Sequence, residues 1–350
     1  MSTDFKHQLQ FLGWNDFLQQ QLQSNDPIHK FARIINEHRD HYILMNGLGE
    51  RIIGILTGKW KKRTSEKDYP SVGDWVQIED TPSRSTGREK SFLIEKRLNP
   101  FSQIIRRAAG TQNKAQVLVS NIDIAFIVSS CNQELDINRI ERYLSLLDDQ
   151  VIKPFLILNK CDLESFKECC EQLTTRFSQI PLILTRSDQP QTINPIKELL
   201  SLGTTSVFLG SSGVGKSTLT NLLLGETKQL IESIRHDDSK GRHTTTSRSL
   251  FILDKPYGII IDTPGLREVQ LSENSHLDVA FSEIAEIALK CRFPDCKHQT
   301  EPNCAVKEAV QNNKLSLEKL IHFQKLLSES KKNQYPTAAQ RKKTKRPLKD

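Results

Sequence analysis

One stretch, SVFLGSSGVGKSTLTNLLL at residues 206–224, constrains the fold of this chain more than any other. Residues 207–209 form an apolar run with the length of a buried strand. Residues 210–217 match the pattern G-x-x-x-x-G-K-[ST] at every fixed position, and good helix formers follow. A strand, a glycine-rich loop and a helix in this order predict a phosphate-binding loop, where backbone N–H groups and the helix N-terminus surround an anion. The alternative is a glycine-rich turn without a ligand.

The phosphate-binding loop assigns roles to individual side chains. Lys216 is expected to reach the β- and γ-phosphates of a nucleoside triphosphate and to act in catalysis, and the Ser217 hydroxyl is expected to ligate Mg²⁺. The predicted nucleotide-binding residues of this segment are Gly210, Ser211, Ser212, Gly213, Val214, Gly215, Lys216, Ser217 and Thr218.

The segments around this loop alternate between strand and helix patterns. Continuous apolar runs at 123–128, 155–158, 181–184 and 258–261 are typical of parallel strands covered on both faces, and residues 137–147 and 165–177 have helical spacing. This alternation predicts a doubly wound α/β domain over about residues 117–270.

A polar segment after the 155–158 strand indicates which base the nucleotide carries. Asn159, Lys160, Cys161 and Asp162 match the pattern N-K-x-D. The Asp162 carboxylate can accept hydrogen bonds from the ring N–H and the exocyclic amine of guanine, a pair of donors that adenine lacks. In a chain that also has a phosphate loop, the pattern predicts a guanine nucleotide. A P-loop ATPase or kinase is the alternative.

Two further segments fit a GTP-dependent switch. Asp262, next to the 258–261 strand, is expected to hold Mg²⁺ through water, and the Gly265 N–H is expected to contact the γ-phosphate. Residues 241–246 (GRHTTT) fit a mobile loop in which Thr246 closes on Mg²⁺ and the γ-phosphate only in the triphosphate state. A plain solvated loop is the alternative for this segment.

The residue after Gly265 bears on how water attacks the γ-phosphate. Leu266 stands where Ras-like enzymes have a glutamine that orients the attacking water, and leucine cannot do so. His243 is our candidate for this catalytic role because it lies in the switch loop. An exposed structural histidine is the alternative.

The residues before the α/β domain have a β pattern. Residues 11–22 predict a short helix, and short strand runs at 42–47, 51–56, 70–78 and 92–95 are joined by polar loops. Several short strands without helical periodicity predict a small closed barrel of the oligonucleotide-binding kind. Composition alone does not separate an RNA-binding barrel from a structural one.

A cysteine cluster follows the α/β domain, between helical segments at 276–289 and 306–329. Three thiols and one imidazole within residues 291–304 predict a closed, structural tetrahedral Zn²⁺ site with no position left for a catalytic water. Unligated cysteines are the alternative. The predicted zinc ligands are Cys291, Cys296, His298 and Cys304.

Positive charge is concentrated at the C-terminus. Residues 331–350 contain eight Lys and Arg against one Asp, a net charge of +7, which equals that of the whole chain. We expect a disordered tail whose partner is a polyanion such as RNA, with a merely solubilising tail as the alternative. No apolar run has the length of a membrane helix and the N-terminus lacks a signal-peptide pattern, so we expect a cytoplasmic protein without membrane association.

The order of the motifs is unusual, because N-K-x-D at 159–162 precedes the phosphate loop at 210–218, the reverse of ordinary GTPases. A doubly wound sheet tolerates such a permutation when the original termini lie close together. This order, with PSVGDWV at 70–76, the loop at 241–246 and the cysteine cluster, resembles the RsgA/YjeQ family of circularly permuted GTPases that act on the small ribosomal subunit. In the resemblance, Leu266 matches the family's hydrophobic substitution and His243 its proposed hydrolytic histidine. Residues 185–187 match the family's base-backing loop poorly.

The motifs and the resemblance together predict an N-terminal OB-like β-barrel, a central circularly permuted P-loop GTPase α/β domain and a C-terminal helical zinc-binding domain. The resemblance implies a monomeric GTP hydrolase, with one structural Zn²⁺ and with Mg²⁺ on GTP, that binds the small subunit and its 16S rRNA, hydrolyses GTP to GDP during late maturation and is then released. The alternative is an RNA-binding assembly factor that GTP switches and in which hydrolysis is incidental. The expected parts are 1–28 extension, 29–112 barrel, 113–272 GTPase domain, 273–330 zinc-knuckle helical domain and 331–350 tail.

Overall fold

The computed structural model describes residues 2–23, 26–58, 60, 69–79, 84–86, 89–107, 115–131, 135–147, 151–162, 165–186, 188–225, 248–253, 258–263 and 276–332. Contacts divide the chain into two compact units. The first combines Met1–Ile104, Val117–Leu135 and Asp149–Arg267, and the second combines Ile105–Gln116, Asp136–Asp148 and Glu268–Asp350. The predicted switch at 241–246, with His243 and Thr246, lies outside the described residues, as do Gly265, Leu266 and residues 333–350.

The N-terminal part of the first unit is a closed barrel, as predicted. Its strands follow the order β1-β2-β3-β6-β4, and β1 also pairs with β4, which closes the ring. The only parallel pair recorded among these barrel strands is β3–β6. Phe31 and Trp75 are buried against Trp14, with ring centroids 5.5 Å and 4.9 Å from it, on the side of β1 and β4 that carries Arg33. The bounds are β1 Phe31–Glu37, β2 Tyr42–Asn46, β3 Arg51–Leu56, β4 Trp75–Ile78 and β6 Glu89–Arg97, and β5 Arg84–Thr86 pairs with β6.

The helix predicted at 11–22 is wrong as a single element. Helix α1, Ser2–Phe11, ends where that prediction begins, and α2, Asp16–Gln19, starts after a turn. Gly13 causes the break, because its φ of +83° is left-handed and a Cβ there would lie 2.4 Å from Arg33 Nη1. Asn15 Oδ1 caps α2 by accepting from Leu18 N at 3.0 Å.

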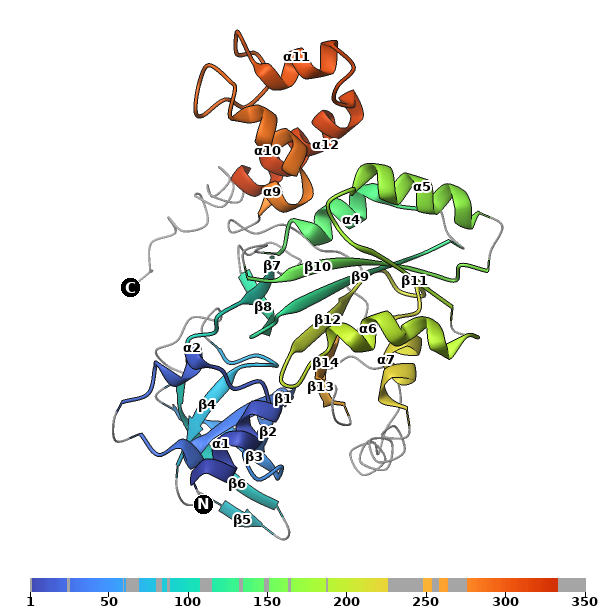
Figure 1. Ribbon diagram of the computed structural model, residues 1–350. Coiled ribbons are helices and arrows are strands. Elements are labelled where there is room, and N and C mark those ends of the chain that lie inside the picture. Colours follow the sequence, from blue (N-terminus) through green and yellow to red (C-terminus); the bar gives the residue numbers. More distant parts are fainter. Residues whose placement is uncertain are drawn as a thin grey trace, which may run out of the picture. The chain divides into compact units, whose positions relative to one another are not determined.

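The rest of the first unit contains the α/β sheet, with strand order β11-β10-β9-β12-β14-β13 (Figure 1). The first five of these strands are parallel, and β13 is antiparallel to β14. Figure 1 shows α5 on one side of the sheet and α6 and α7 on the other, as a doubly wound fold requires. The bounds are β9 Ile124–Ser130, β10 Lys153–Asn159, β11 Leu182–Thr185, β12 Thr205–Leu209, β13 Ser249–Ile252, β14 Ile259–Asp262, α5 Phe166–Arg176, α6 Asn194–Leu199 and α7 Lys216–Leu224.

Strand β13 has no counterpart in the sequence prediction, and it joins the barrel to the α/β sheet. It pairs with β14 on one side and with β1 on the other, so in the described residues the two sheets form one continuous 12-stranded sheet. Two short strands, β7 Gln103–Arg107 and β8 Ala115–Ser120, form a separate ladder in the connection between barrel and sheet.

The second unit is helical. Helix α4 packs here through Arg142, whose Nη1 donates to Glu329 Oε1 at 2.7 Å, and through a buried pair between Glu141 and His322. The two helices predicted for the C-terminal region are each divided in two, at Phe281 and at residues 312–316, and α12 extends into the segment expected as tail. The bounds are α4 Ile137–Leu144, α9 Leu277–Ala280, α10 Ser282–Ala288, α11 Ala305–Gln311 and α12 Leu317–Lys332.

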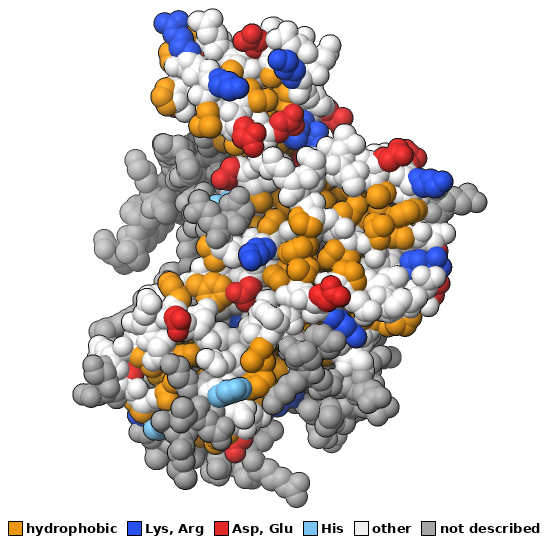
Figure 2. All heavy atoms as spheres, in the orientation of Figure 1, with side chains coloured by type: hydrophobic (Ala, Val, Ile, Leu, Met, Phe, Trp, Pro, Cys, Tyr) orange, Lys and Arg blue, Asp and Glu red, His pale blue; other side chains and the backbone are white. Residues whose placement is uncertain are grey.

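On the face shown in Figure 2, acidic and basic side chains are interspersed over the helices of the second unit. None of the helices in the described residues has the length and apolar character needed to cross a bilayer.

Candidate nucleotide site and metal cluster

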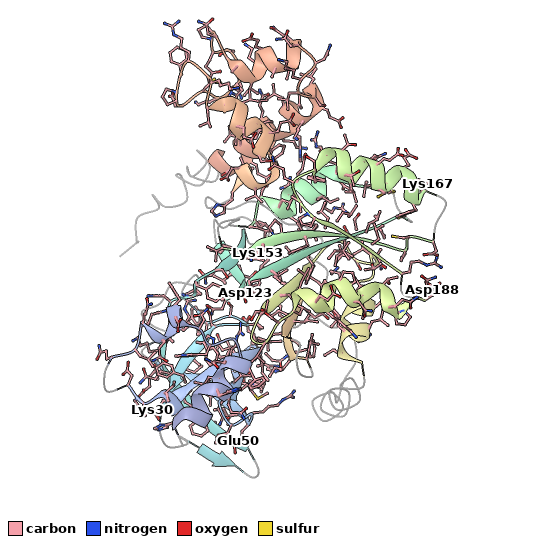
Figure 3. All side chains as sticks on the ribbon, in the orientation of Figure 1. Lys30, Glu50, Asp123, Lys153, Lys167 and Asp188 are labelled. Carbon is pink, nitrogen blue, oxygen red and sulfur yellow. The ribbon has the colours of Figure 1, made fainter. Side chains whose placement is uncertain are left out.

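The nucleotide motifs follow strands that end at the same edge of the sheet. Strand β9 lies between β10 and β12, and both neighbours are parallel to it. The segments that follow β10 and β12 therefore leave the sheet on the same side, where ligands bind in open α/β folds. In Figure 3, Asp188, just beyond β11, lies at the opposite end of the sheet from Asp123 and Lys153, which mark the strand starts.

The N-K-x-D segment and the phosphate loop are in direct contact. Asn159 Nδ2 donates to Val214 O at 3.0 Å, and Lys160 Nζ donates to Gly213 O at 3.1 Å. Gly215 has a φ of +104°, and a Cβ there would lie 2.1 Å from Asn159 Nδ2, so only glycine allows this approach. Segments far apart in the chain thus meet, and Asp162, two residues after Lys160, is exposed.

Thr185 supports the N-K-x-D segment, and the sequence prediction left it out. Its Oγ1 donates to Asn159 Oδ1 at 3.1 Å, and its backbone O accepts from Cys161 N at 3.5 Å. Thr185 and Asn159 are both fully buried. The segment 185–187 matched the expected loop poorly, but a polar residue that ends an apolar strand next to β10 was a usable signal.

Lys216 is held inside the phosphate loop. Its Nζ donates to Gly210 O at 2.8 Å and to Ser211 O at 2.6 Å. Burial lowers the pKa of the Lys216 ammonium, while the nearby charge of Asp262 acts in the opposite direction. Ser217 and Thr218 are exposed at the start of α7, and Asp262, 9% exposed, ends β14. Lys216 is therefore buried within the loop, whereas Ser217 and Thr218 are exposed.

The four predicted metal ligands converge. The ligand atoms of Cys291, Cys296, His298 and Cys304 all lie within 4.8 Å of one another. Cys291 Sγ lies 3.9 Å from Cys304 Sγ, and His298 Nδ1 lies 3.3 Å from Cys304 Sγ. Ligands of a tetrahedral Zn²⁺ at about 2.0–2.3 Å are separated by roughly 3.3–3.8 Å, so the donor set fits that ion.

The surroundings of the cluster agree with a metal site. Burial, with the neighbouring sulfurs of Cys304 and Cys291, raises the pKa of the Cys296 thiol to about 11. Clustered thiols lose their protons when a cation binds between them. Glu301, which the sequence prediction missed, accepts from Lys297 N at 2.9 Å and Gln299 N at 2.8 Å, and these backbone bonds lower its pKa to about 2. This carboxylate orders the loop that carries His298.

A phosphate loop joined to an N-K-x-D segment that precedes it in the chain, on a doubly wound sheet, defines a circularly permuted P-loop GTPase. The family model described as "RsgA GTPase" matches residues 98–272. The chain belongs to the RsgA GTPase family, as the resemblance predicted, and it is a GTPase.

Relatives match nearly the whole chain. The "Small ribosomal subunit biogenesis GTPase RsgA 2" of Vibrio parahaemolyticus is 39% identical over 345 residues, which cover 95% of this chain and 88% of the relative. The "Small ribosomal subunit biogenesis GTPase RsgA" of Opitutus terrae is 36% identical over 330 residues, 92% of this chain and 89% of that protein.

Two crystal structures have the same fold. YjeQ from Thermotoga maritima superposes with a TM-score of 0.62 at 25% identity, covering 86% of this chain and 98% of its own. YloQ, described as a circularly permuted GTPase, has a TM-score of 0.60 at 21% identity, covering 89% of this chain and 98% of its own, and supports the fold. The predicted barrel, permuted GTPase domain and C-terminal helical region with a Cys₃His cluster are confirmed.

Proposed function

We propose that this protein is a Mg²⁺-dependent GTPase that binds the small ribosomal subunit late in its assembly and hydrolyses GTP to GDP and phosphate. Hydrolysis is stimulated by the subunit and leads to release. The observation that carries the proposal is the contact between Asn159 and the Val214 carbonyl, which brings the base-selective segment to the phosphate loop. The names of the relatives supply the subunit as partner.

In this proposal, different residues bind the base, the phosphates and the Mg²⁺ of the nucleotide. Asp162 accepts from the two donors of guanine, while Asn159, Lys160 and Cys161 shape the segment around it. Lys216 exchanges its two carbonyl acceptors for the β- and γ-phosphates. Ser217 and Asp262 hold Mg²⁺, which neutralises phosphate charge when bound. His243, Thr246 and Gly265 act on the γ-phosphate side, and residues 210–215 with Thr218 enclose the phosphates.

In this proposal, the remaining parts of the chain bind the small subunit or keep the C-terminal region folded. The barrel at 29–112 and the basic tail at 331–350 bind 16S rRNA, because both present polar or cationic groups to a polyanion. One structural Zn²⁺ held by the Cys₃His cluster keeps residues 273–330 folded. The protein works as a monomer in the cytoplasm, where its substrate particle is made.

Phosphate release with and without purified small subunits tests the proposal. We expect strong stimulation by the subunit in the wild type and none in Lys216→Ala, because the lysine contacts the phosphates. Subunit binding without any stimulation would favour the alternative, a GTP-switched RNA-binding factor in which hydrolysis is incidental.

Competition between nucleotides tests the base assignment. We expect ATP to leave bound GTP in place at equal concentration, since a site built around a carboxylate rejects a base that lacks its donors by roughly 10⁴-fold or more. Displacement by ATP in an equilibrium binding assay would contradict the role of Asp162.

A further inference from the structure

Asp262 belongs to a row of side chains that crosses three strands. Ser249 of β13 pairs directly with Asp262 of β14, and Asn36 of β1 pairs directly with Ser249. Directly opposed residues of antiparallel strands point to the same face, with Cβ atoms about 4.5–5.5 Å apart. The three side chains therefore stand in line on one face, from the barrel to the nucleotide site.

The barrel half of this row is hydrogen-bonded and shielded. Asn36 Nδ2 donates to Ser249 Oγ at 2.7 Å. Ser249 is 8% exposed and Asp262 is 9% exposed, so little water competes for either polar side chain.

Local irregularity in β1 directs Asn36 toward Ser249. The register of β1 with β2 shifts between Ile34 and Asn36, which leaves Ile35 as an extra residue. A bulge of this kind re-aims the side chains that follow it, because one added residue reverses the face to which they point. The bulge therefore sets which barrel side chain reaches β13.

Arg248 anchors the start of β13 next to this row. Its Nη1 donates to Leu118 O at 3.1 Å and lies 3.4 Å from Glu37 Oε2. Burial raises the pKa of Glu37, and the Arg248 charge opposes that shift. Strand β13 is thus fastened to β1 by a main-chain pairing, a side-chain hydrogen bond and an ion pair.

We propose that Ser249 and Asn36 are positioning residues for the GTPase reaction: they orient the Asp262 carboxylate that acts on Mg²⁺, and they make barrel strand β1 part of the nucleotide site. The inference rests on the proposed role of Asp262. Residues that orient a metal-directed ligand change metal affinity when removed, even though they touch neither metal nor substrate.

Two Mg²⁺ titrations of the full-length protein test this inference: one follows GTP hydrolysis, and the other follows Mg²⁺ binding to the GDP-bound protein by calorimetry, where the same shifts in Mg²⁺ affinity are expected. Ser249→Ala and Asn36→Ala should each raise the Mg²⁺ concentration for half-maximal rate, by about tenfold for Ser249→Ala. Their kcat at saturating Mg²⁺ should remain near that of the wild type. Ser249→Thr, which keeps the hydroxyl, should restore the wild-type Mg²⁺ dependence.

Two further variants separate the possible failures. Asn46→Ala removes a barrel asparagine whose bonds, to Leu48 N and Glu50 N at 2.9 Å, stay within its own hairpin, and it should leave the Mg²⁺ dependence unchanged. Asp262→Asn should shift the dependence strongly. If Asp262→Asn shifts the Mg²⁺ dependence, but Asn36→Ala and Ser249→Ala have the Mg²⁺ dependence of the wild type, the positioning role is wrong. If Asp262→Asn causes no shift, the proposed role of Asp262 is wrong and the inference falls with it. Should Ser249→Ala not fold, the half-buried Asn36 decides the outcome.

Discussion

Arg33 links four separate segments of the first unit. It is fully buried, and its guanidinium donates to Leu12 O at 2.5 Å, Gly73 O at 3.1 Å and Thr205 Oγ1 at 2.9 Å, with a further bond to Asn121 O. Burial lowers its pKa to about 10, with Asp123 and Asp74 opposing the shift, so it stays charged at neutral pH. Arg33→Met should destabilise the first unit by about 3–5 kcal/mol in urea unfolding, because the buried carbonyls lose their donors.

Two further variants test whether the several hydrogen bonds of the Arg33 guanidinium account for this loss of stability. Arg33→Lys keeps the charge but cannot present a fork of donors in several directions, so it should lose nearly as much stability. Arg51→Met removes an exposed arginine of the same barrel and should change stability by about 0.5 kcal/mol or less. A loss for Arg33→Met no larger than that for Arg51→Met would contradict the assignment.

Among the elements, the phosphate loop shows how close packing restricts sequence. Gly213 and Gly215 both have left-handed φ values, +86° and +104°, but a Cβ at Gly213 meets nothing within 4 Å, whereas one at Gly215 meets Asn159 at 2.1 Å. Asn159 cannot move aside, because it is fully buried and bonded to Thr185 and Val214. Gly213→Ala should cost only about 1–2 kcal/mol of backbone strain. Gly215→Ala should weaken GDP binding by at least about tenfold more than Gly213→Ala does, which corresponds to about 1.4 kcal/mol of binding free energy.

Calorimetry of GDP binding compares the two glycine variants directly. Circular dichroism of each variant serves as the folding control, since Val214 of the loop belongs to the same buried core as Phe126 and Phe208. Equal GDP affinities for Gly213→Ala and Gly215→Ala would show that Asn159 can move away from the added methyl group.

At the scale of the whole molecule, the chain divides into two compact units. The proposed nucleotide site lies in the first unit, and the Cys₃His cluster lies in the second. A zinc chelator should therefore unfold residues 273–330 while leaving GDP binding intact, because metal binding supplies folding free energy only where the ligands are. GDP at 100 times its Kd should stabilise the first unit by about 2.7 kcal/mol.

Scanning calorimetry with and without chelator and GDP measures both effects. We expect two transitions, of which one responds to the chelator and the other to GDP. Cys170→Ser, a change at a cysteine outside the cluster, is the control and should retain the chelator-sensitive transition. One transition that responds equally to both additions would contradict independent folding.

The sequence by itself determined the features whose chemistry demands fixed local spacing. A loop that surrounds a phosphate needs its glycines, Lys216 and Ser217 at set positions, and a metal site of this kind needs its ligands close to one ion. Both motifs can therefore be recognised within a short stretch of sequence. Strands β10 and β12 could be predicted from the sequence because a strand covered on both faces has to be continuously apolar. Within those limits the order of the motifs also identified the permuted fold.

Only the tertiary structure decided which distant residues meet. Strand β13, the burial of Arg33, the support that Thr185 gives Asn159 and the row of Asn36, Ser249 and Asp262 each join segments separated by tens to hundreds of residues. Pairing between strands depends on register and on neighbours from elsewhere in the chain, and local periodicity carries neither. Residues 250–253 (LFIL) form an apolar run as long as the one at 155–158, but only the two partner strands show that this segment joins the barrel to the α/β sheet.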